Sequence, residues 1–255
     1  MRNSRIMSAL RGGDVVRLAM MGYFIPPFIA YAADAGYHGV WIDLEHHAMD
    51  AREVQALLAF CHHYDIDGLI RSPTREKGQL YRYLEDGAAG LIMPHVSTAE
   101  TAREIVQKVR FPPLGDRGLE GFGFEANFGL DSGNLVAHAN HETCLIVQIE
   151  TPEALENVEA IAAVDGVDGL YIGPGDLGIR LALLPEATRP TMDAVMERVA
   201  AACARHRKAW GIFALDEARV RRQQELGARL LVWGADFLLL RDGVRRAAAV
   251  LQGGG

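Results

Sequence analysis

Residues 38–71 read HGVWIDLEHHAMDAREVQALLAFCHHYDIDGLIR. Two apolar runs, over 38–44 and 68–71, flank a stretch over 51–63 in which apolar residues recur with the spacing of an amphipathic helix. Asp50 immediately precedes this stretch, where an aspartate commonly caps a helix. A strand, a helix and a second strand in this order predict one unit of a parallel sheet, because parallel neighbours need a crossover connection that is usually helical.

The same alternation continues along the chain. Short apolar runs separated by stretches of helical periodicity predict strands at 17–22, 38–44, 68–71, 90–94, 143–150, 169–172, 209–213 and 229–233. Eight such strands with helices between them predict an α/β protein with the (β/α)₈ TIM-barrel fold, as a single domain over residues 1–255. An open, doubly wound parallel sheet is the alternative. A final helix is predicted at 237–252, followed by a disordered C-terminal tip near 253–255.

The composition limits the class of protein. The 255 residues are 49% hydrophobic and carry a formal net charge of −7, so a sizeable core is expected, and neither nucleic acid nor a membrane is expected as a partner. The first residues lack the apolar stretch of a signal peptide, and no apolar run has the length of a membrane span. The three cysteines are far apart, which is typical of reduced thiols in a cytoplasmic protein.

Ionisable and amide side chains stand at the predicted carboxyl ends of four strands. In a parallel barrel these ends meet at one mouth, where the active site lies. The side chains are Asp43, Glu45 and His46 at the end of the strand at 38–44, Arg71 at the end of the next strand, Gln148 and Glu150 at the end of the strand at 143–150, and Asp176 beyond the strand at 169–172. In the structural alternative, Asp176 caps the following helix and Glu150 pairs with Arg71. The whole set favours a catalytic mouth.

Glu150 and Asp176 are candidate metal ligands. They are carboxylates that follow neighbouring strands, and oxygen ligands with room for water suit a hard divalent cation. We therefore expect Mg²⁺ or Mn²⁺, with Co²⁺ as a further candidate.

Two other kinds of cofactor chemistry are not expected. The segment GPGDLG at 173–178 matches G-x-G-x-x-G, but no strand ending in an acid follows at the required distance, so NAD binding is not predicted. Its helix-start amides remain candidates for binding a substrate carboxylate. Lys77, Lys108 and Lys208 lie in predicted helices or at the amino end of a strand, so no Schiff-base lysine is expected.

Several motifs, in order along most of the chain, resemble the HpcH/HpaI aldolase family. They are Asp43-x-Glu45-His46, Arg71 after an apolar strand, FPPLGDRG at 111–118, VQIETPEALEN at 147–157, GVDGLYIGPGDLG at 166–178 and GIFALD at 211–216. The resemblance implies a class II, metal-dependent pyruvate aldolase, similar to 4-hydroxy-2-oxoheptanedioate aldolase and to 2-keto-3-deoxy-sugar-acid aldolases.

The resemblance also implies the roles of the groups that act on the substrate. Glu150 and Asp176 match the metal ligands, and Arg71 matches the arginine that holds the keto oxygen of pyruvate and stabilises the enolate. His46, oriented by Asp43, matches an imidazole that transfers protons through a water beside the metal.

Further roles follow from the same resemblance. Gln148 is expected on the pyruvate side, the amides of Gly175 and Asp176 at the pyruvate carboxylate, and Glu45 in support of the water network. The family is typically hexameric, a trimer of dimers that exchange the last helix, so a homo-oligomer is expected.

Four places depart from the family pattern. They are RSPTRE at 71–76, Glu85 where a helix aspartate is common, the loop GLEGFGFEANFGLD at 118–131, and PGDLG at 174–178. Glu85 is assigned a supporting role. Because these positions concern the aldehyde side and the subunit contacts, they leave the reaction class in place and the acceptor open.

The sequence therefore predicts a lyase that reversibly cleaves a 4-hydroxy-2-oxo acid to pyruvate and an aldehyde through a metal-stabilised enolate. Alternatives within the same family are oxaloacetate decarboxylation and a citrate-synthase-like condensation. A non-catalytic barrel that binds a small acid is the alternative from another class. The glycine-rich segment 114–133 is expected to select the aldehyde, since long loops in compact domains are usually functional.

Overall fold

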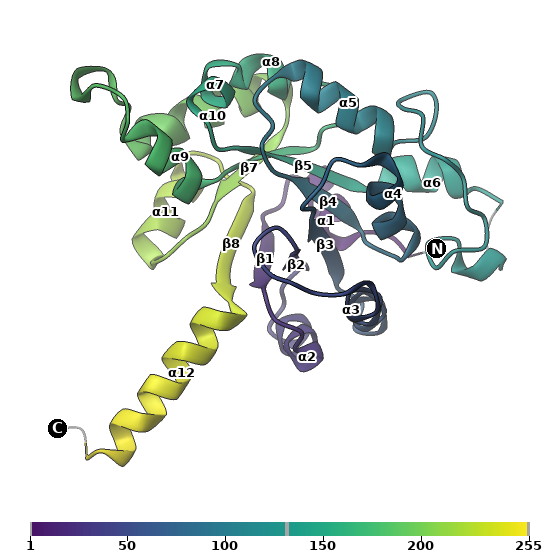
Figure 1. Ribbon diagram of the computed structural model, residues 1–255, viewed down its shortest axis with the longest axis horizontal. Helices are drawn as coiled ribbons and strands as arrows, with labels where there is room; N and C mark the ends of the chain where they lie inside the picture. The colour runs from purple at the N-terminus through teal and green to yellow at the C-terminus, as the bar shows by residue number, and fades with distance from the viewer. Residues whose placement is uncertain (1, 131–132, 254–255) are drawn as a thin grey trace.

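Eight parallel strands alternate with helices along residues 2–130 and 133–253, the parts of the chain that the computed structural model describes (Figure 1). The strands are β1 (Val16–Met21), β2 (Gly39–Asp43), β3 (Asp67–Arg71), β4 (Gly90–Met93), β5 (Cys144–Ile149), β6 (Gly169–Ile172), β7 (Ala209–Ile212) and β8 (Leu230–Ala235).

Strand pairing closes the sheet into a barrel. The order is β7-β6-β5-β4-β3-β2-β1-β8, and the two end strands meet through a parallel bridge between Phe213 and Val232. The amide of Ala214 also donates to the carbonyl of Val232, at 3.0 Å. The predicted (β/α)₈ barrel is confirmed, and the alternative of an open sheet is wrong.

Helices surround the barrel and close its amino end, where Ile6 and Ala9 of the first helix join the apolar interior. The helices are α1 (Arg5–Gly12), α2 (Pro26–Asp34), α3 (Ala51–His63), α4 (Lys77–Glu85), α5 (Ala99–Val109), α6 (Leu135–Glu142), α7 (Pro152–Glu156), α8 (Val158–Ala162), α9 (Pro174–Leu181), α10 (Met192–His206), α11 (Glu217–Glu225) and α12 (Asp236–Leu251), with short 3₁₀ turns η1 (Asn127–Gly129) and η2 (Glu186–Thr188).

The predicted cap at the start of α3 is confirmed. The carboxylate of Asp50 accepts hydrogen bonds from the amides of Arg52 and Glu53, at 2.8 and 2.9 Å. The carboxylate of Glu53 in turn accepts from the amide of Asp50, at 2.9 Å. This reciprocal capping box satisfies amides that the first helical turn leaves without partners. It therefore ends the irregular segment that follows β2 and starts the helix at a fixed residue.

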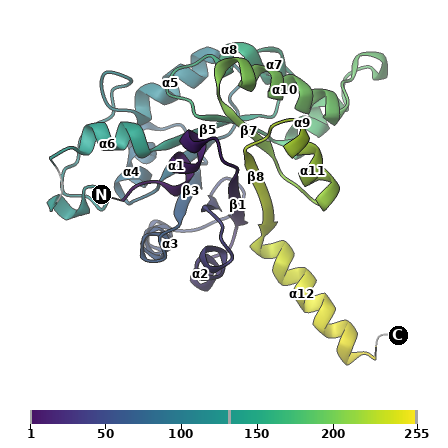
Figure 2. The same ribbon diagram turned by 180° about the vertical axis from the view of Figure 1, so that it is seen from behind.

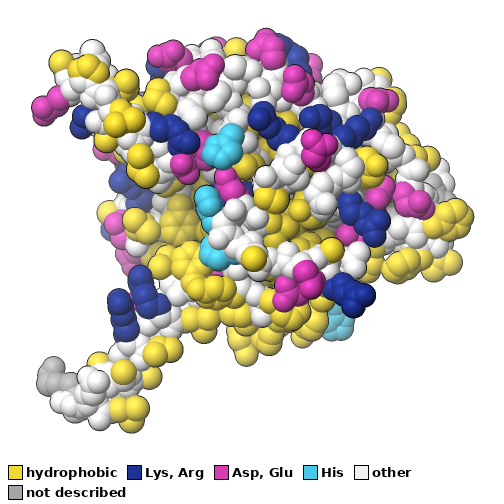
Figure 3. Space-filling view, in the orientation of Figure 1, with side chains coloured by type: hydrophobic (Ala, Val, Ile, Leu, Met, Phe, Trp, Pro, Cys, Tyr) yellow, Lys and Arg dark blue, Asp and Glu magenta, His cyan; other side chains and the backbone are white. Residues whose placement is uncertain are grey.

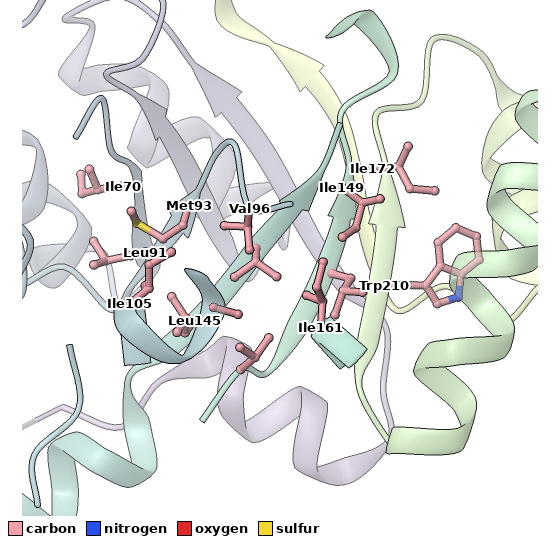
Figure 4. Close-up of a cluster of buried hydrophobic side chains, with 14 of the residues drawn as sticks. Ile70, Leu91, Met93, Val96, Ile105, Leu145, Ile149, Ile161, Ile172 and Trp210 are labelled. Carbon is pink, nitrogen blue, oxygen red and sulfur yellow. The ribbon is translucent and has the colours of Figure 1, made fainter. Parts of the chain in front are cut away.

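Side chains along each strand alternate between two apolar clusters, because successive residues of a strand point to opposite faces. One cluster lies between the strands and the helices and includes Ile149 of β5 and Ile161 of α8 (Figure 4). The other fills the barrel interior and includes Trp41 and Tyr171. Complete burial of a large aliphatic side chain contributes about 1.5–3 kcal/mol, so the outer cluster holds the helices against the barrel.

Helix α12 extends away from the barrel (Figures 1 and 2). Only Asp236, its first residue, is buried, and apolar side chains along it are exposed, from 49% at Leu240 to 88% at Leu251. The predicted final helix is confirmed, whereas Gly254 and Gly255 of the predicted disordered tip lie outside the described residues. None of the helices in the described ranges has the length and apolar character that crossing a membrane requires.

The glycine-rich segment 114–133, of which residues 131 and 132 are outside the described ranges, lies at the amino end of the barrel. It follows α5, and its Phe124 contacts Gly87 and His62, which lie at the carboxyl ends of α4 and α3. These helix ends precede the strands and so lie opposite the mouth. The prediction that this segment selects the aldehyde is therefore wrong for the site of its own chain.

Candidate active site

A cavity of about 190 Å³ lies at the carboxyl ends of the strands. On the corresponding face, histidine side chains gather near the centre beside acidic and basic ones (Figure 3). Six of the predicted site residues line the cavity. The full lining is Met20, Trp41, His46, Arg71, Gln148, Glu150, Tyr171, Gly173, Pro174, Gly175, Asp176 and Phe213.

A second cavity, of about 280 Å³, lies at the amino end. Its charged side chains are satisfied by other protein groups. Arg2 forms an ion pair with Asp67, and Glu142 accepts from the amide of Ser4 at 2.6 Å and pairs with Arg11 at 2.9 Å. The cavity at the mouth instead contains the predicted site residues, at the carboxyl ends of the strands where parallel barrels carry their active sites. The mouth is therefore the candidate active site.

Arg71 is locked in place by a forked ion pair. Its Nε and Nη2 donate to the two carboxylate oxygens of Asp43, both at 2.7 Å, and its Nη1 lies 3.2 Å from Glu45 Oε2. The pairing follows from the fold, because Asp43 and Arg71 are register partners on β2 and β3. Burial of Asp43 disfavours its charged form, but the hydrogen bonds and charge of Arg71 outweigh this, so the pKa of Asp43 is lowered.

Asp43 orients His47, not His46. His47 Nδ1 lies 2.9 Å from Asp43 Oδ2, and its ring stacks on Phe237, with centroids 5.6 Å apart. The orientation of His46 by Asp43, which the resemblance implied, is therefore wrong. The backbone bends over residues 45–47 and brings residue i+4 back over Asp43.

His46 is the histidine of this pair that lines the cavity. Its side chain is 55% exposed, and its Nε2 lies 3.7 Å from Glu45 Oε2. The imidazole is therefore at the mouth, as the sequence predicted, but a different carboxylate is its neighbour.

Glu45, His95 and Glu150 form a cluster that could hold a cation. One ligand atom from each lies within 4.8 Å of the others. His95 connects the two carboxylates: its Nε2 lies 3.0 Å from Glu45 Oε1 and its Nδ1 lies 2.9 Å from Glu150 Oε1. Its backbone has a left-handed φ of 56° and its amide donates to the same Glu150 oxygen, at 2.5 Å. Such a conformation costs energy in a non-glycine residue and concentrates at functional sites.

The sequence analysis missed His95. It follows β4 directly in the segment IMPHV at 92–96, so the rule that strand ends carry the chemistry applies to it as well. That rule was used only for strands whose ends carried an acid, an amide or an arginine.

The electrostatics of Glu150 suit a bound cation. Burial raises its pKa; the amide and ring of His95 act in the opposite direction, and the nearby charges of Glu45 and Asp176 raise it further. A buried carboxylate surrounded by other carboxylates is stabilised in its charged form by a divalent cation. The donor set of this site therefore fits a metal ion.

Asp176 lies in the first turn of α9 and lines the same cavity. Its Oδ1 accepts from Nη1 of Arg180 at 2.6 Å. It does not cap the helix, and Glu150 pairs with His95, so the structural alternative for these two carboxylates is wrong. The amides of Gly175 and Asp176 belong to the first helical turn, which leaves them without intrahelical partners.

Of the two remaining predicted site residues, Gln148 lies in the cavity and Glu85 lies outside it. Gln148 Nε2 donates to Glu150 Oε2 at 3.1 Å, at the floor of the cavity. Glu85 ends α4, and its carbonyl accepts from the amide of Glu125 at the amino end of the barrel. Glu85 is therefore not part of its own chain's site, because the end of a helix lies opposite the end of the strand that precedes it.

A parallel barrel with acids, imidazoles and a fixed arginine at the carboxyl ends of its strands defines the class of (β/α)₈ barrel enzymes. Residues 24–242 match the family described as HpcH/HpaI aldolase/citrate lyase. A hydroxypyruvate/pyruvate aldolase from Roseovarius nubinhibens is 35% identical over 242 residues, which cover 95% of this chain and 94% of that protein. The chain therefore belongs to the HpcH/HpaI aldolase/citrate lyase family.

Two further comparisons agree with this family assignment. A 2-keto-3-deoxy-L-rhamnonate aldolase from Klebsiella pneumoniae is 35% identical over 222 residues, which cover 87% of this chain and 83% of that protein. The crystal structure of an HpcH/HpaI aldolase from Desulfitobacterium hafniense superposes with a TM-score of 0.88 at 30% identity, covering 96% of this chain and 95% of that one.

Proposed function

We propose that this protein is a divalent-metal-dependent aldolase, an aldehyde-lyase that reversibly cleaves a 4-hydroxy-2-oxo acid to a pyruvate-type 2-oxo acid and an aldehyde. The observation that carries the proposal is one cavity at the barrel mouth that contains Arg71, His46 and Glu150. The names of the relatives from Roseovarius and Klebsiella support the reaction class.

Glu150 is proposed as the central metal ligand. The sequence analysis proposes Asp176 as the second metal ligand beside Glu150. Glu45 and His95 are an alternative pair of ligands that would bind the metal together with Glu150. A divalent cation bound there supplies positive charge that polarises the keto group of a 2-oxo acid. Mg²⁺ and Mn²⁺ suit the carboxylates, and Co²⁺ also suits the imidazole of His95.

The protein groups supply binding, charge and proton transfer. The amides of Gly175 and Asp176, at the amino end of α9, are proposed to bind the substrate carboxylate. In the cleavage direction the C4 hydroxyl loses its proton, the bond between C3 and C4 breaks, and C3 later gains a proton. We assign the proton transfers to His46. Arg71 provides a fixed charge beside the keto oxygen, where negative charge develops.

One assay tests the reaction class. Pyruvate is incubated with Mg²⁺, Mn²⁺ or Co²⁺ in D₂O, and deuterium incorporation at C3 is followed with and without a panel of aldehydes. Exchange together with aldol formation supports the proposal. Pyruvate release from oxaloacetate without aldol formation indicates decarboxylation instead, and consumption of oxaloacetate by a condensation indicates citrate-synthase-like chemistry. Binding without exchange indicates a non-catalytic barrel.

Arg71→Lys is expected to lower kcat by about 10²-fold, the lower range for loss of a preorganised donor to a developing oxyanion. Lysine keeps the charge but cannot form the fork to Asp43 or lie flat over Trp41, which Arg71 Cζ approaches to 5.2 Å. The measurements are kcat and the Tm, with the exposed Arg103→Lys as control. Turnover within about threefold of the parent, well under 1 kcal/mol, contradicts the role.

We also propose that the protein is a homo-oligomer in which α12 lies on another copy, with the hexamer implied by the family resemblance as the expected form. The exposed apolar residues of α12 include Leu240, Val244 and Leu251. An isolated helix of this length is marginal in water, because most helical stability comes from packing of an apolar face. A second copy offers the same helix and barrel, so the contact is self-complementary.

The double change Leu240→Asp and Val244→Asp is expected to convert the oligomer into smaller species, because it places two charges in an apolar contact. Light scattering coupled to gel filtration gives the molar mass of each variant. The control is Ala249→Asp, on the face of α12 that carries Asp242 and Arg245. A parent protein that elutes as a monomer refutes the proposal.

The three cysteines are buried free thiols, which fits the proposed cytoplasmic location, where thiols stay reduced.

A further inference from the structure

The ring of His47 lies in a cage formed by three residues, Gly22, Tyr23 and Phe237. The ring stacks on Phe237, with centroids 5.6 Å apart and an angle of 23° between the two planes. Tyr23 meets the same ring edge to face, with centroids 5.9 Å apart. Aromatic pairs at these separations attract each other, so the two neighbouring rings favour one orientation of the imidazole.

Gly22 completes the cage directly after β1. A β-carbon at this position would lie 2.7 Å from His47 Nε2 and 2.9 Å from Cε1, which is closer than such atoms approach. Glycine therefore allows the imidazole to lie against the backbone itself, one of the uses of a residue without a side chain. A larger residue at position 22 has no room while His47 keeps this orientation.

The carboxylate of Asp236 holds the three residues of the cage together. Asp236 is the first residue of α12 and is 1% exposed. It accepts hydrogen bonds from the amides of Gly22 at 3.0 Å, of Tyr23 at 2.8 Å and of Phe237 at 2.7 Å. Amide hydrogen bonds to a carboxylate are stronger than those between neutral groups. The end of β1 and the start of α12 are therefore fixed to each other around the His47 ring.

The cage reaches the active site through one oxygen of Asp43. Asp43 Oδ2 contacts His47 Nδ1 at 2.9 Å and also accepts from Arg71 Nη2 at 2.7 Å. Without His47 the carboxylate is freer to rotate, because the torsion that turns a carboxylate is soft. Arg71 depends on both oxygens of that carboxylate for its fork. A displacement of a catalytic group by about 1 Å can cost about 10²-fold in rate.

We propose that Phe237 is a positioning residue of the reaction, which together with Gly22 and Tyr23 holds His47 against Asp43 and thereby keeps Arg71 in place. The inference rests on the proposed function, which assigns Arg71 to the keto oxygen. The first turn of α12 is therefore part of the support of the active site, although the rest of the helix extends away from the barrel (Figure 1).

Phe237→Leu tests the proposal, because it removes the stacking ring and keeps an apolar side chain. It is expected to lower kcat for aldol cleavage by about five- to tenfold, up to the cost of losing His47 itself. KM and Mn²⁺ affinity should stay within about twofold of the parent, since the lost support acts on the transition state. Phe237→Tyr keeps the ring and should retain the kcat of the parent.

The matched control is Phe60→Leu. Phe60 lies near the carboxyl end of α3, away from the mouth, and stacks on Tyr64 with centroids 6.3 Å apart. The substitution removes an aromatic contact of the same kind and should change neither kcat nor KM. A loss of kcat equal to that of Phe237→Leu overturns the inference.

A double-mutant cycle distinguishes positioning from a general loss of stability. In a His47→Ala background, Phe237→Leu should lower kcat by less than about twofold, because residues that act through one contact are not additive. Gly22→Ala is the second variant, since its β-carbon displaces the same ring from the backbone side. It should lower kcat in the parent and have little effect in the His47→Ala background. Equal losses in both backgrounds overturn the inference, as does an unchanged kcat for Phe237→Leu.

Crystal structures of the parent and of Phe237→Leu separate this inference from the proposed function. If the parent neither cleaves a 4-hydroxy-2-oxo acid nor exchanges pyruvate with any metal tested, the proposed function fails. Loss of the 2.9 Å contact between His47 and Asp43 in the variant, together with a displaced Arg71, then still supports the positioning role of Phe237. An unchanged fork between Arg71 and Asp43 in the variant overturns it.

Discussion

His46→Ala is expected to slow aldol cleavage by roughly 10²–10⁴-fold, the range that a positioned general acid or base contributes. His46 lines the cavity, and its half-exposed ring is next to Glu45. The measurement is kcat for cleavage at saturating metal. Mn²⁺ affinity should change little, because Glu45, His95 and Glu150 remain.

His47→Ala is the matched control and is expected to cost much less, about tenfold. His47 lies outside the cavity and acts through Asp43, which holds Arg71, and loss of such an outer partner typically costs 10–100-fold. Two results contradict the assignment of the proton carrier to His46. They are an equal effect of the two substitutions, and a larger effect of His47→Ala, in which case Asp43 and His47 form the catalytic pair.

Glu150→Gln is expected to lower turnover by about 10³-fold or more and to abolish tight Mn²⁺ binding. The reason is that Glu150 belongs to both proposed ligand sets, and loss of several kcal/mol of charge stabilisation corresponds to this factor. Glutamine keeps the shape and the contact with the His95 amide, so the fold should survive. Exhaustive chelation of the parent protein should have the same effect and should be reversed by adding Mn²⁺.

Two further substitutions identify the ligand set. If Asp176 is a ligand, Asp176→Asn weakens Mn²⁺ binding, measured by titration calorimetry, more than His95→Ala does. If the cluster of Glu45, His95 and Glu150 holds the ion, the order is reversed. Full activity after chelation, or trapping of pyruvate on a lysine by borohydride, contradicts metal dependence altogether.

The fold could be predicted from the sequence because it depends on patterns that are local. The apolar runs on either side of 51–63 and the cap at Asp50 specify a strand, a helix and a strand, and their repetition specifies a parallel barrel. The barrel in turn implies that residues at strand ends, such as Arg71 and Glu150, share one cavity. These inferences need only the spacing of residues and the rule that parallel strands end at one edge.

Which side chains meet in the mouth was decided by the tertiary structure. The bend after Asp43 brings His47 to its carboxylate, where the family resemblance implied His46. His95 reaches Glu45 and Glu150 through a left-handed backbone conformation that no pattern in IMPHV reveals.

The tertiary structure also decided which predicted residues lie far from the mouth. Glu85 and the segment 114–133 lie at the far end of the barrel, because a helix that follows a strand returns to the opposite end. The sequence by itself determined the order of elements and the edge at which the chemistry lies, because these depend on local periodicity and on strand direction. The tertiary structure decided the hydrogen-bond partners, because these depend on backbone bends and on side chains far apart in the chain.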